Sequence, residues 1–142
     1  MTVMQILDEK GRQVFTLQDN QVVADAVTVM NEHNVGALVV TNSAGDVVGI
    51  ISERDIMRQL SSHPQTVMSL GIAKCMRPKP YTLGKTASVD DVMNLMSSKR
   101  IRHLPIVENN KLVGIVSIGD VVKRQIADAE HEREALKEYI AG

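Results

Sequence analysis

The chain has 142 residues, 44% of them hydrophobic, which is enough for one compact domain or two very small ones. Aromatic residues make up only 2% and Trp is absent, which excludes stacking on aromatic side chains as the main binding device. The 16 basic and 17 acidic residues give a net charge of −1 with no Lys/Arg-rich run, which argues against a nucleic-acid partner.

The sequence also indicates a compartment. Cys75 is the single cysteine and cannot form an internal disulfide, which fits a reducing environment. No apolar run of about 18 residues is present, so no transmembrane helix is expected. The N-terminus lacks the basic and apolar regions of a signal peptide. We therefore expect a soluble cytoplasmic protein with no membrane partner.

Hydrophobic periodicity predicts the elements of the first half of the chain. They are, in order, a helical turn (2–7), an extended piece (14–17), a helix (about 22–33), a strand (36–40), a second strand (47–51) and a helix (52–60). A polar turn joins the two strands into a hairpin. The small and polar residues after the last helix are a linker candidate.

One motif is written twice. Gly49-Ile50-Ile51-Ser52-Glu53-Arg54-Asp55 recurs as Gly114-Ile115-Val116-Ser117-Ile118-Gly119-Asp120 after a spacing of 65 residues. Each copy is typical of a buried strand that runs directly into a helix. The serine is a good N-cap, and the aspartate three residues later can complete a capping box. Helix capping alone does not explain why the same motif occurs twice in matching positions of the two halves.

The other elements recur as well. Residues 81–83 echo the extended piece, a capped helix starts at Ser88, and a second hairpin follows. The fold class is therefore α+β, with two tandem β-α-β-β-α copies packed by pseudo-twofold symmetry. The predicted organisation is repeat 1 over 1–62, a linker over 63–71, repeat 2 over 72–127 and a C-terminal helix extension over 128–142.

The extension carries an apolar stripe at heptad-like spacing with one polar member. The stripe consists of Val122, Ile126, Ala129, Arg133, Leu136 and Ile140. Two interpretations remain open. The helix either folds back on its own module or forms a homodimer contact, since two to three heptads are too few for an isolated coiled coil.

These features resemble a tandem pair of cystathionine-β-synthase (CBS) domains, often called a Bateman module. The two Gly-x-x-Ser-x-x-Asp motifs resemble the family signature. The segments 34–40 and 102–107 resemble the first strand of the family's sheet. The repeat order and length also match over about residues 1–127. No catalytic or DNA-binding domain is attached, so the chain is similar to a stand-alone module.

The resemblance implies a set of ligand-binding residues. The signature aspartates, Asp55 and Asp120, would accept hydrogen bonds from the ribose hydroxyls of an adenosine nucleotide. The serines begin helices whose free N–H groups favour phosphate. The full set implied by the resemblance is Thr16, Ala37, Ser52, Arg54, Asp55, Thr82, Arg102, His103, Ser117 and Asp120.

Structural interpretations exist for the same residues. Asp55 and Asp120 can be capping partners only, Arg54 a solvated helix residue and His103 a structural histidine. The two copies also differ, because Arg54 is replaced by Gly119 in the second motif, and Arg102 and His103 stand where the first copy has Gly36 and Ala37. The clefts are therefore chemically unequal and we expect asymmetric binding, although the sequence does not assign each basic residue to a cleft.

The resemblance favours a non-catalytic regulatory module that senses AMP, ADP, ATP or NAD(H), with S-adenosylmethionine less expected. Ligand binding would change the tilt of the repeats or the geometry of a homodimer, and an unknown protein target would read that change. No catalytic motif or metal cluster was found, so we expect no enzyme, no catalytic cofactor and no metal. The alternative is a ligand-independent interaction scaffold.

Overall fold

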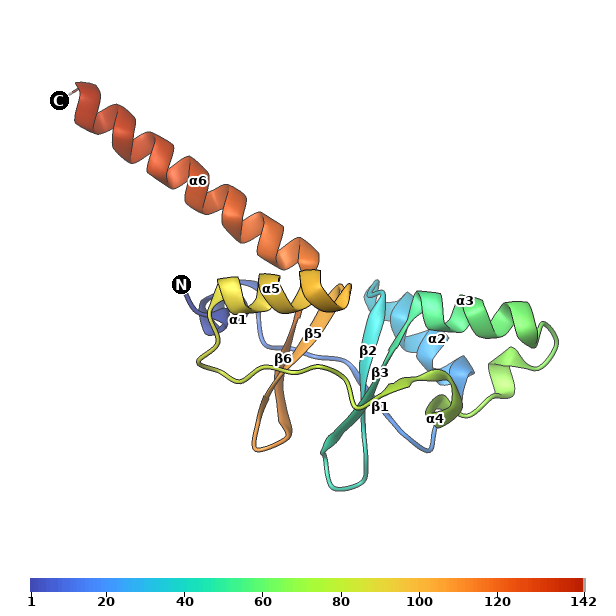
Figure 1. Cartoon of the computed structure of the whole chain (residues 1–142). Coiled ribbons are helices and arrows are strands. Elements are labelled where there is room, and N and C mark those ends of the chain that lie inside the picture. Colours follow the sequence, from blue (N-terminus) through green and yellow to red (C-terminus); the bar gives the residue numbers. More distant parts are fainter. Residues whose placement is uncertain (142) are drawn as a thin grey trace.

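The computed structural model describes residues 1–141 and is drawn in Figure 1. Its elements, in chain order, are α1 (Val3–Lys10), β1 (Thr16–Gln18), α2 (Val23–His33), β2 (Ala37–Thr41), β3 (Val47–Ser52), α3 (Glu53–Ser62), the 3-10 turn η1 (Val67–Ser69), α4 (Ile72–Cys75), β4 (Arg77–Pro78), α5 (Val89–Lys99), β5 (His103–Glu108), β6 (Lys111–Ser117) and α6 (Ile118–Ala141). The predicted α+β class with two repeats is confirmed, and the order β-α-β-β-α is complete in the first of them.

The first half contains a four-stranded sheet in the order β1-β2-β3-β4. β1 runs parallel to β2, while β2, β3 and β4 pair antiparallel in succession. All five residues of β2 are buried, which explains why the run is continuously apolar rather than alternating. Helix α3 begins directly after β3 because Ser52 caps it.

The second half contains the β5–β6 hairpin, but the strand expected at residues 81–83 is reduced to one parallel bridge between Leu83 and Ile106. Pro105 explains the loss. It has no N–H to donate, so the parallel ladder cannot continue from Leu83 to Tyr81. The first half has Val39 at the equivalent position, and there the ladder of β1 forms.

Each hydrophobic core takes a helix from outside its own predicted repeat. Val3, Ile6 and Leu7 of α1 lie in the core of the second half. Ile72 and Cys75 of α4 lie in the core of the first half. The predicted boundaries therefore follow the repeat of the sequence pattern. In the structure, α1 packs with the second half and α4 packs with the first.

The glycines of the two motifs make room for these exchanged helices. A Cβ on Gly114 would lie 2.8 Å from Cδ2 of Leu7, and a Cβ on Gly49 would clash with the side chain of Met76. Leu7 and Met76 thus occupy equivalent places in the two halves. Beyond these two residues the halves differ, because α1 continues as a helix to Lys10 whereas α4 ends at Cys75 and Arg77 lies in β4.

The two hairpins lie side by side in the middle of the module (Figure 1), and an isolated bridge joins Asp46 to Lys111 near their tips. Lys111 Nζ donates 2.6 Å hydrogen bonds to the carbonyl of Ala44 and to Oδ1 of Asp46. The hydrogen bonds of Lys111 therefore hold the two halves together at the hairpin tips.

Helix α6 projects away from the module (Figure 1). Every residue from Ala129 to Ala141 is exposed, and residue 142 lies outside the described residues. The folded-back interpretation is therefore not found in this single chain. Ile126 and Leu136 of the apolar stripe are 54% and 59% exposed. Within residues 1–141, no helix has the length and apolar character needed to span a bilayer.

Candidate functional site

Within residues 1–141, Asp55 is one of two buried polar or charged residues, with 6% of its surface exposed. Its Oδ2 accepts hydrogen bonds from the backbone N–H (2.8 Å) and the hydroxyl (2.9 Å) of Ser52. The backbone N–H of Asp55 donates in return to Oγ of Ser52, so the predicted capping box is present. Among residues 1–141, Oδ1 of Asp55 accepts no hydrogen bond. The carboxylate is thus held rigidly by one oxygen and leaves the other available.

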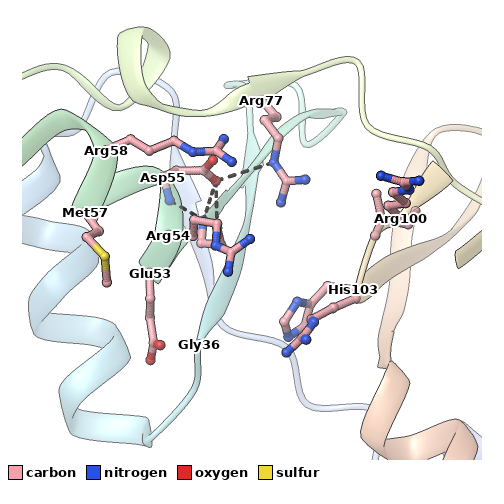
Figure 2. A pocket seen from close by; sticks show the side chains of 12 residues that line it. Gly36, Glu53, Arg54, Asp55, Met57, Arg58, Arg77, Arg100 and His103 are labelled. Carbon is pink, nitrogen blue, oxygen red and sulfur yellow. Dashed lines mark hydrogen bonds and ion pairs between the residues drawn. The ribbon is translucent and has the colours of Figure 1, made fainter. Parts of the chain in front are cut away.

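A cleft of about 410 Å³ surrounds this carboxylate (Figure 2). One wall is the start of α3, which carries Arg54 and Arg58, and the other is the segment that leads into β5. The cleft therefore lies between the two halves of the module. The residues that line it are Gly36, Ser52, Glu53, Arg54, Asp55, Met57, Arg58, Arg77, Arg100, Ile101, Arg102 and His103.

The cleft is rich in cations. Arg77 Nε lies 3.5 Å from Oδ2 of Asp55. The other four arginines, Arg54, Arg58, Arg100 and Arg102, form no ion pair within the described chain. The guanidinium groups seen in Figure 2 come from both walls.

Arg100 reaches the cleft at the cost of an unfavourable backbone. It is the C-cap of α5 and adopts the left-handed conformation, with φ 54° and ψ 47°. Asn34 holds the same position and the same dihedrals after α2 in the first half. Asparagine accepts this conformation readily, whereas most side chains pay about 1–2 kcal/mol for it. The second half thus holds an arginine where an asparagine suits the backbone better.

His103 is half-buried at the start of β5, opposite Ser117 in the hairpin register. Burial lowers the pKa of His103, and the nearby charges of Arg77, Lys10 and Arg102 lower it further against the opposing effect of Asp120. The imidazole is therefore neutral at pH 7 in the free chain.

The second motif is arranged differently. Oδ2 of Asp120 accepts from the backbone N–H of Ser117 (2.8 Å) and from Lys10 Nζ (2.6 Å), and Lys10 also donates to the carbonyl of Ile115 (2.9 Å). Burial alone would raise the pKa of Asp120, but the hydrogen bonds from Lys10 and Ser117 outweigh it and lower that pKa. A cavity of about 320 Å³ beside this pair includes Glu9.

The structure brings five of the predicted residues into one cleft, namely Ser52, Arg54, Asp55, Arg102 and His103. Ser117 and Asp120 lie together in the second motif. Thr16 is exposed on β1, Thr82 is half-buried before α5, and Ala37 is buried opposite Ser52; none of these three lines the Asp55 cleft.

Sequence reasoning missed Arg58, Arg77 and Arg100. Arg58 follows Arg54 by one helical turn, so helix spacing could have indicated it. Arg100 precedes Arg102 at a predicted helix end. Arg77 had no such signal, because its position depends on α4 packing into the first core. Among residues 1–141 no cluster of three or more His, Cys, Asp or Glu side chains is suited to hold a metal ion.

The chain matches the model of the CBS domain twice, over residues 6–62 and 72–127. Two repeats with paired Ser/Asp motifs and a cleft between them define a tandem CBS pair, and the chain belongs to the CBS domain family. The CBS domain-containing protein CBSX3, mitochondrial, of Arabidopsis thaliana is 33% identical over 149 residues, which span 99% of this chain and 72% of the relative.

Solved structures agree. A CBS-domain-containing protein of Agrobacterium tumefaciens is 34% identical with a TM-score of 0.83, and the match covers 88% of this chain and 99% of that one. A structure of CBSX2 in complex with AMP is 23% identical with a TM-score of 0.69, covering 82% and 90%. A CBS domain pair in complex with 5′-methylthioadenosine and S-adenosylmethionine is 24% identical with a TM-score of 0.79, covering 90% and 98%. The last two share the fold with this chain.

Proposed function

We propose that this chain is a regulatory module that binds an adenosine-containing ligand in the Asp55 cleft. The observation that carries the proposal is the Asp55 carboxylate, which is buried, fixed by Ser52 through one oxygen and open at the other. A carboxylate so placed is a strong acceptor for the hydroxyls of a ribose. The arginines around it suit the phosphates that follow the ribose.

The adenosine part of the proposal is supported by the two structures of the same fold, one in complex with AMP and one with methylthioadenosine and S-adenosylmethionine. The cleft offers Met57, Ile101 and the backbone of Gly36 for a base, and no aromatic side chain lines it in the described chain. Base recognition would therefore use aliphatic contacts and backbone hydrogen bonds. Thr16, Ala37 and Thr82 stay predicted contacts.

The cleft joins α3 of the first half to the start of β5 in the second. A ligand that touches both walls stabilises one relative tilt of the halves, because it binds that arrangement more tightly than others. The hairpin tips, pinned by Lys111 and Asp46, are the natural pivot for this motion. We further propose that the module is non-catalytic and cytoplasmic, and that the exposed stripe of α6 pairs with a second copy so that tilt is transmitted through a homodimer.

The test compares two aspartates with the same capping geometry. Ser88 and Asp91 form a capping box like that of Ser52 and Asp55, with bonds of 2.9 and 3.0 Å, but Asp91 lies outside the cleft. Thermal stabilisation by AMP, ADP, ATP, NAD, NADH and S-adenosylmethionine is measured for the wild type, Asp55→Asn and Asp91→Asn. A ligand that binds only the folded state at a hundredfold excess over Kd stabilises it by about 2.7 kcal/mol.

We expect at least one of these ligands to stabilise the wild type and Asp91→Asn, and to lose its effect on Asp55→Asn. If no ligand stabilises the wild type, and both variants lose only the roughly 1 kcal/mol of a helix cap, the motif is structural and the interaction scaffold is the better description.

A further inference from the structure

The Asp55 cleft has more positively charged than negatively charged side chains. Five arginines and two carboxylates line it, which leaves three positive charges in excess. The carboxylates do not remove the imbalance. Asp55 is paired with Arg77, and Glu53 lies against Gly36, where a Cβ would stand 3.4 Å from its Oε1. His103 is neutral, because burial and the neighbouring cations lower its pKa.

The four arginines without an ion pair in the described chain are exposed, and like charges gathered in one cleft repel one another and raise the local concentration of an anion. Arg54 and Arg58 present this charge from the first half, and Arg100 and Arg102 present it from the second. Arg100 does so from a left-handed backbone that its counterpart Asn34 adopts more easily. Strain of this kind persists where the surrounding structure and the function of the site maintain it.

The second motif carries fewer of these charges at equivalent positions. Gly119 stands where Arg54 stands and Asn34 where Arg100 stands, whereas Lys123 stands where Arg58 stands. The group of five arginines is therefore found in one cleft, and only part of its charge is repeated in the second half.

We propose that the ligand of the Asp55 cleft is an adenosine di- or triphosphate, with the phosphate chain held between Arg54 and Arg58 on one wall and Arg100 and Arg102 on the other. This rests on the proposed function and specifies its ligand class. A single phosphate carries about −1.5 to −2 charges at neutral pH, which leaves part of the excess uncompensated, and a longer chain compensates it. A cationic sulfonium ligand adds to the excess instead.

The first experiment is calorimetric titration, without divalent cations, of adenosine, AMP, ADP, ATP and inorganic tripolyphosphate. We expect ADP or ATP to bind about tenfold or more tightly than AMP, the gain of one additional charge-assisted contact. Raising the salt concentration should weaken ATP binding strongly and adenosine binding little. Equal or tighter binding of AMP overturns the inference and leaves the proposed function standing.

Two further outcomes separate the proposals. Tripolyphosphate binding without any binding of nucleotides overturns the adenosine function while confirming a polyanion cleft. The absence of any binding overturns both.

The second experiment uses Arg100→Asn, which the backbone of Asn34 shows to be compatible with the fold. The variant should keep or gain thermal stability, lose about tenfold in ATP affinity and keep its affinity for adenosine. Arg12→Gln is the matched control, because Arg12 is an exposed arginine paired with Asp8 outside the cleft and its removal should leave ATP binding unchanged. Equal losses for both variants overturn the assignment of the phosphate chain to this wall.

Discussion

Lys10 Nζ donates a 2.6 Å hydrogen bond to Oδ2 of Asp120, whereas the cation beside the equivalent carboxylate, Arg77, keeps its Nε 3.5 Å from Oδ2 of Asp55. Lys10 comes from α1, the helix that the N-terminus contributes to the second half. The lysine thus stands beside the acceptor that a ribose would need in the second cleft. The two sites therefore differ in how closely a cation holds the signature carboxylate, as well as in the arginines around it.

Lys10→Met tests this difference. The wild type is expected to bind one nucleotide per chain, in the Asp55 cleft. Removal of the ammonium leaves the backbone N–H of Ser117 as the donor to Oδ2 of Asp120 in the described chain, so a second and weaker site for adenosine should appear, and calorimetric stoichiometry measures it. Two equal and independent sites in the wild type would contradict the role given to Lys10, as would a variant that still binds only one adenosine.

His103 predicts a dependence on pH. Because the folded state lowers its pKa, the unfolded chain takes up a proton near pH 6.5 while the folded chain does not. The contribution of His103 is therefore unfavourable to folding below about pH 6.5 and vanishes above it, so stability falls as pH falls from about 7 to 5. His103→Gln should flatten this part of the melting-temperature profile.

A bound nucleotide should shift the pKa of His103 in the opposite direction. Phosphates beside His103 favour the imidazolium and raise its pKa, so ATP should bind more tightly as pH falls from about 8 to 6. His131→Gln, on the exposed part of α6, is the control and should behave as the wild type does. An unchanged pH profile for His103→Gln, with and without ATP, would show that this histidine does not face the phosphates.

Gly49→Ala is expected to damage both the fold and the cleft. The added Cβ would clash with Met76 and stand 3.1 Å from the backbone carbonyl of Arg77, which cannot yield as a side chain does. Overpacking of this kind costs about 1–3 kcal/mol, and it displaces Arg77 from Asp55. Chemical denaturation should show the loss.

Gly119→Ala is the control, and it should raise the folding stability rather than lower it. Its Cβ would lie 3.6 Å from Oγ of Ser117, an ordinary contact, in the first turn of α6. Replacing a helical glycine with alanine stabilises by roughly 0.5–1 kcal/mol. A stable Gly49→Ala protein with unaltered ligand binding would show that the approach of α4 is less tight than the structure has it.

The stripe on α6 predicts the oligomeric state. Ile126→Glu and Leu136→Glu place charges on an apolar face that is exposed in the single chain. Both should abolish the homodimer in sedimentation while leaving the melting temperature of the module nearly unchanged, since neither side chain lies in a core. Glu130→Gln, outside the stripe, is the control. A wild type that is monomeric at micromolar concentration would remove this role for α6.

Much of the fold could be predicted from the sequence, because the two halves repeat the same motif and the same order of hydrophobic segments. The paired motif predicted both strand-to-helix junctions, and the capping boxes at Ser52 and Ser88 form as expected. The strand at 81–83 failed because its partner strand contains Pro105, a property of a residue more than twenty positions away.

The candidate site was less accessible. Asp55 and Arg54 were found because they belong to a local motif. The sequence did not predict that the arginines gather in one cleft. That arrangement depends on the start of β5 facing α3 across the cleft, and on the packing of α4, which places Arg77 beside Asp55. The ion pair of Lys10 and Asp120 joins residues 110 positions apart, and no local pattern encodes it.

The exchange of α1 and α4 has a consequence for how the chain is made. The first core draws on one continuous segment from Phe15 to Met76, whereas the second joins Val3–Leu7 to residues from Leu83 onward. The first half is, in topology, an insertion within the second. During synthesis it can complete its packing while the second half still awaits β6, and α1, the earliest helix to emerge, is among the last to find its partners.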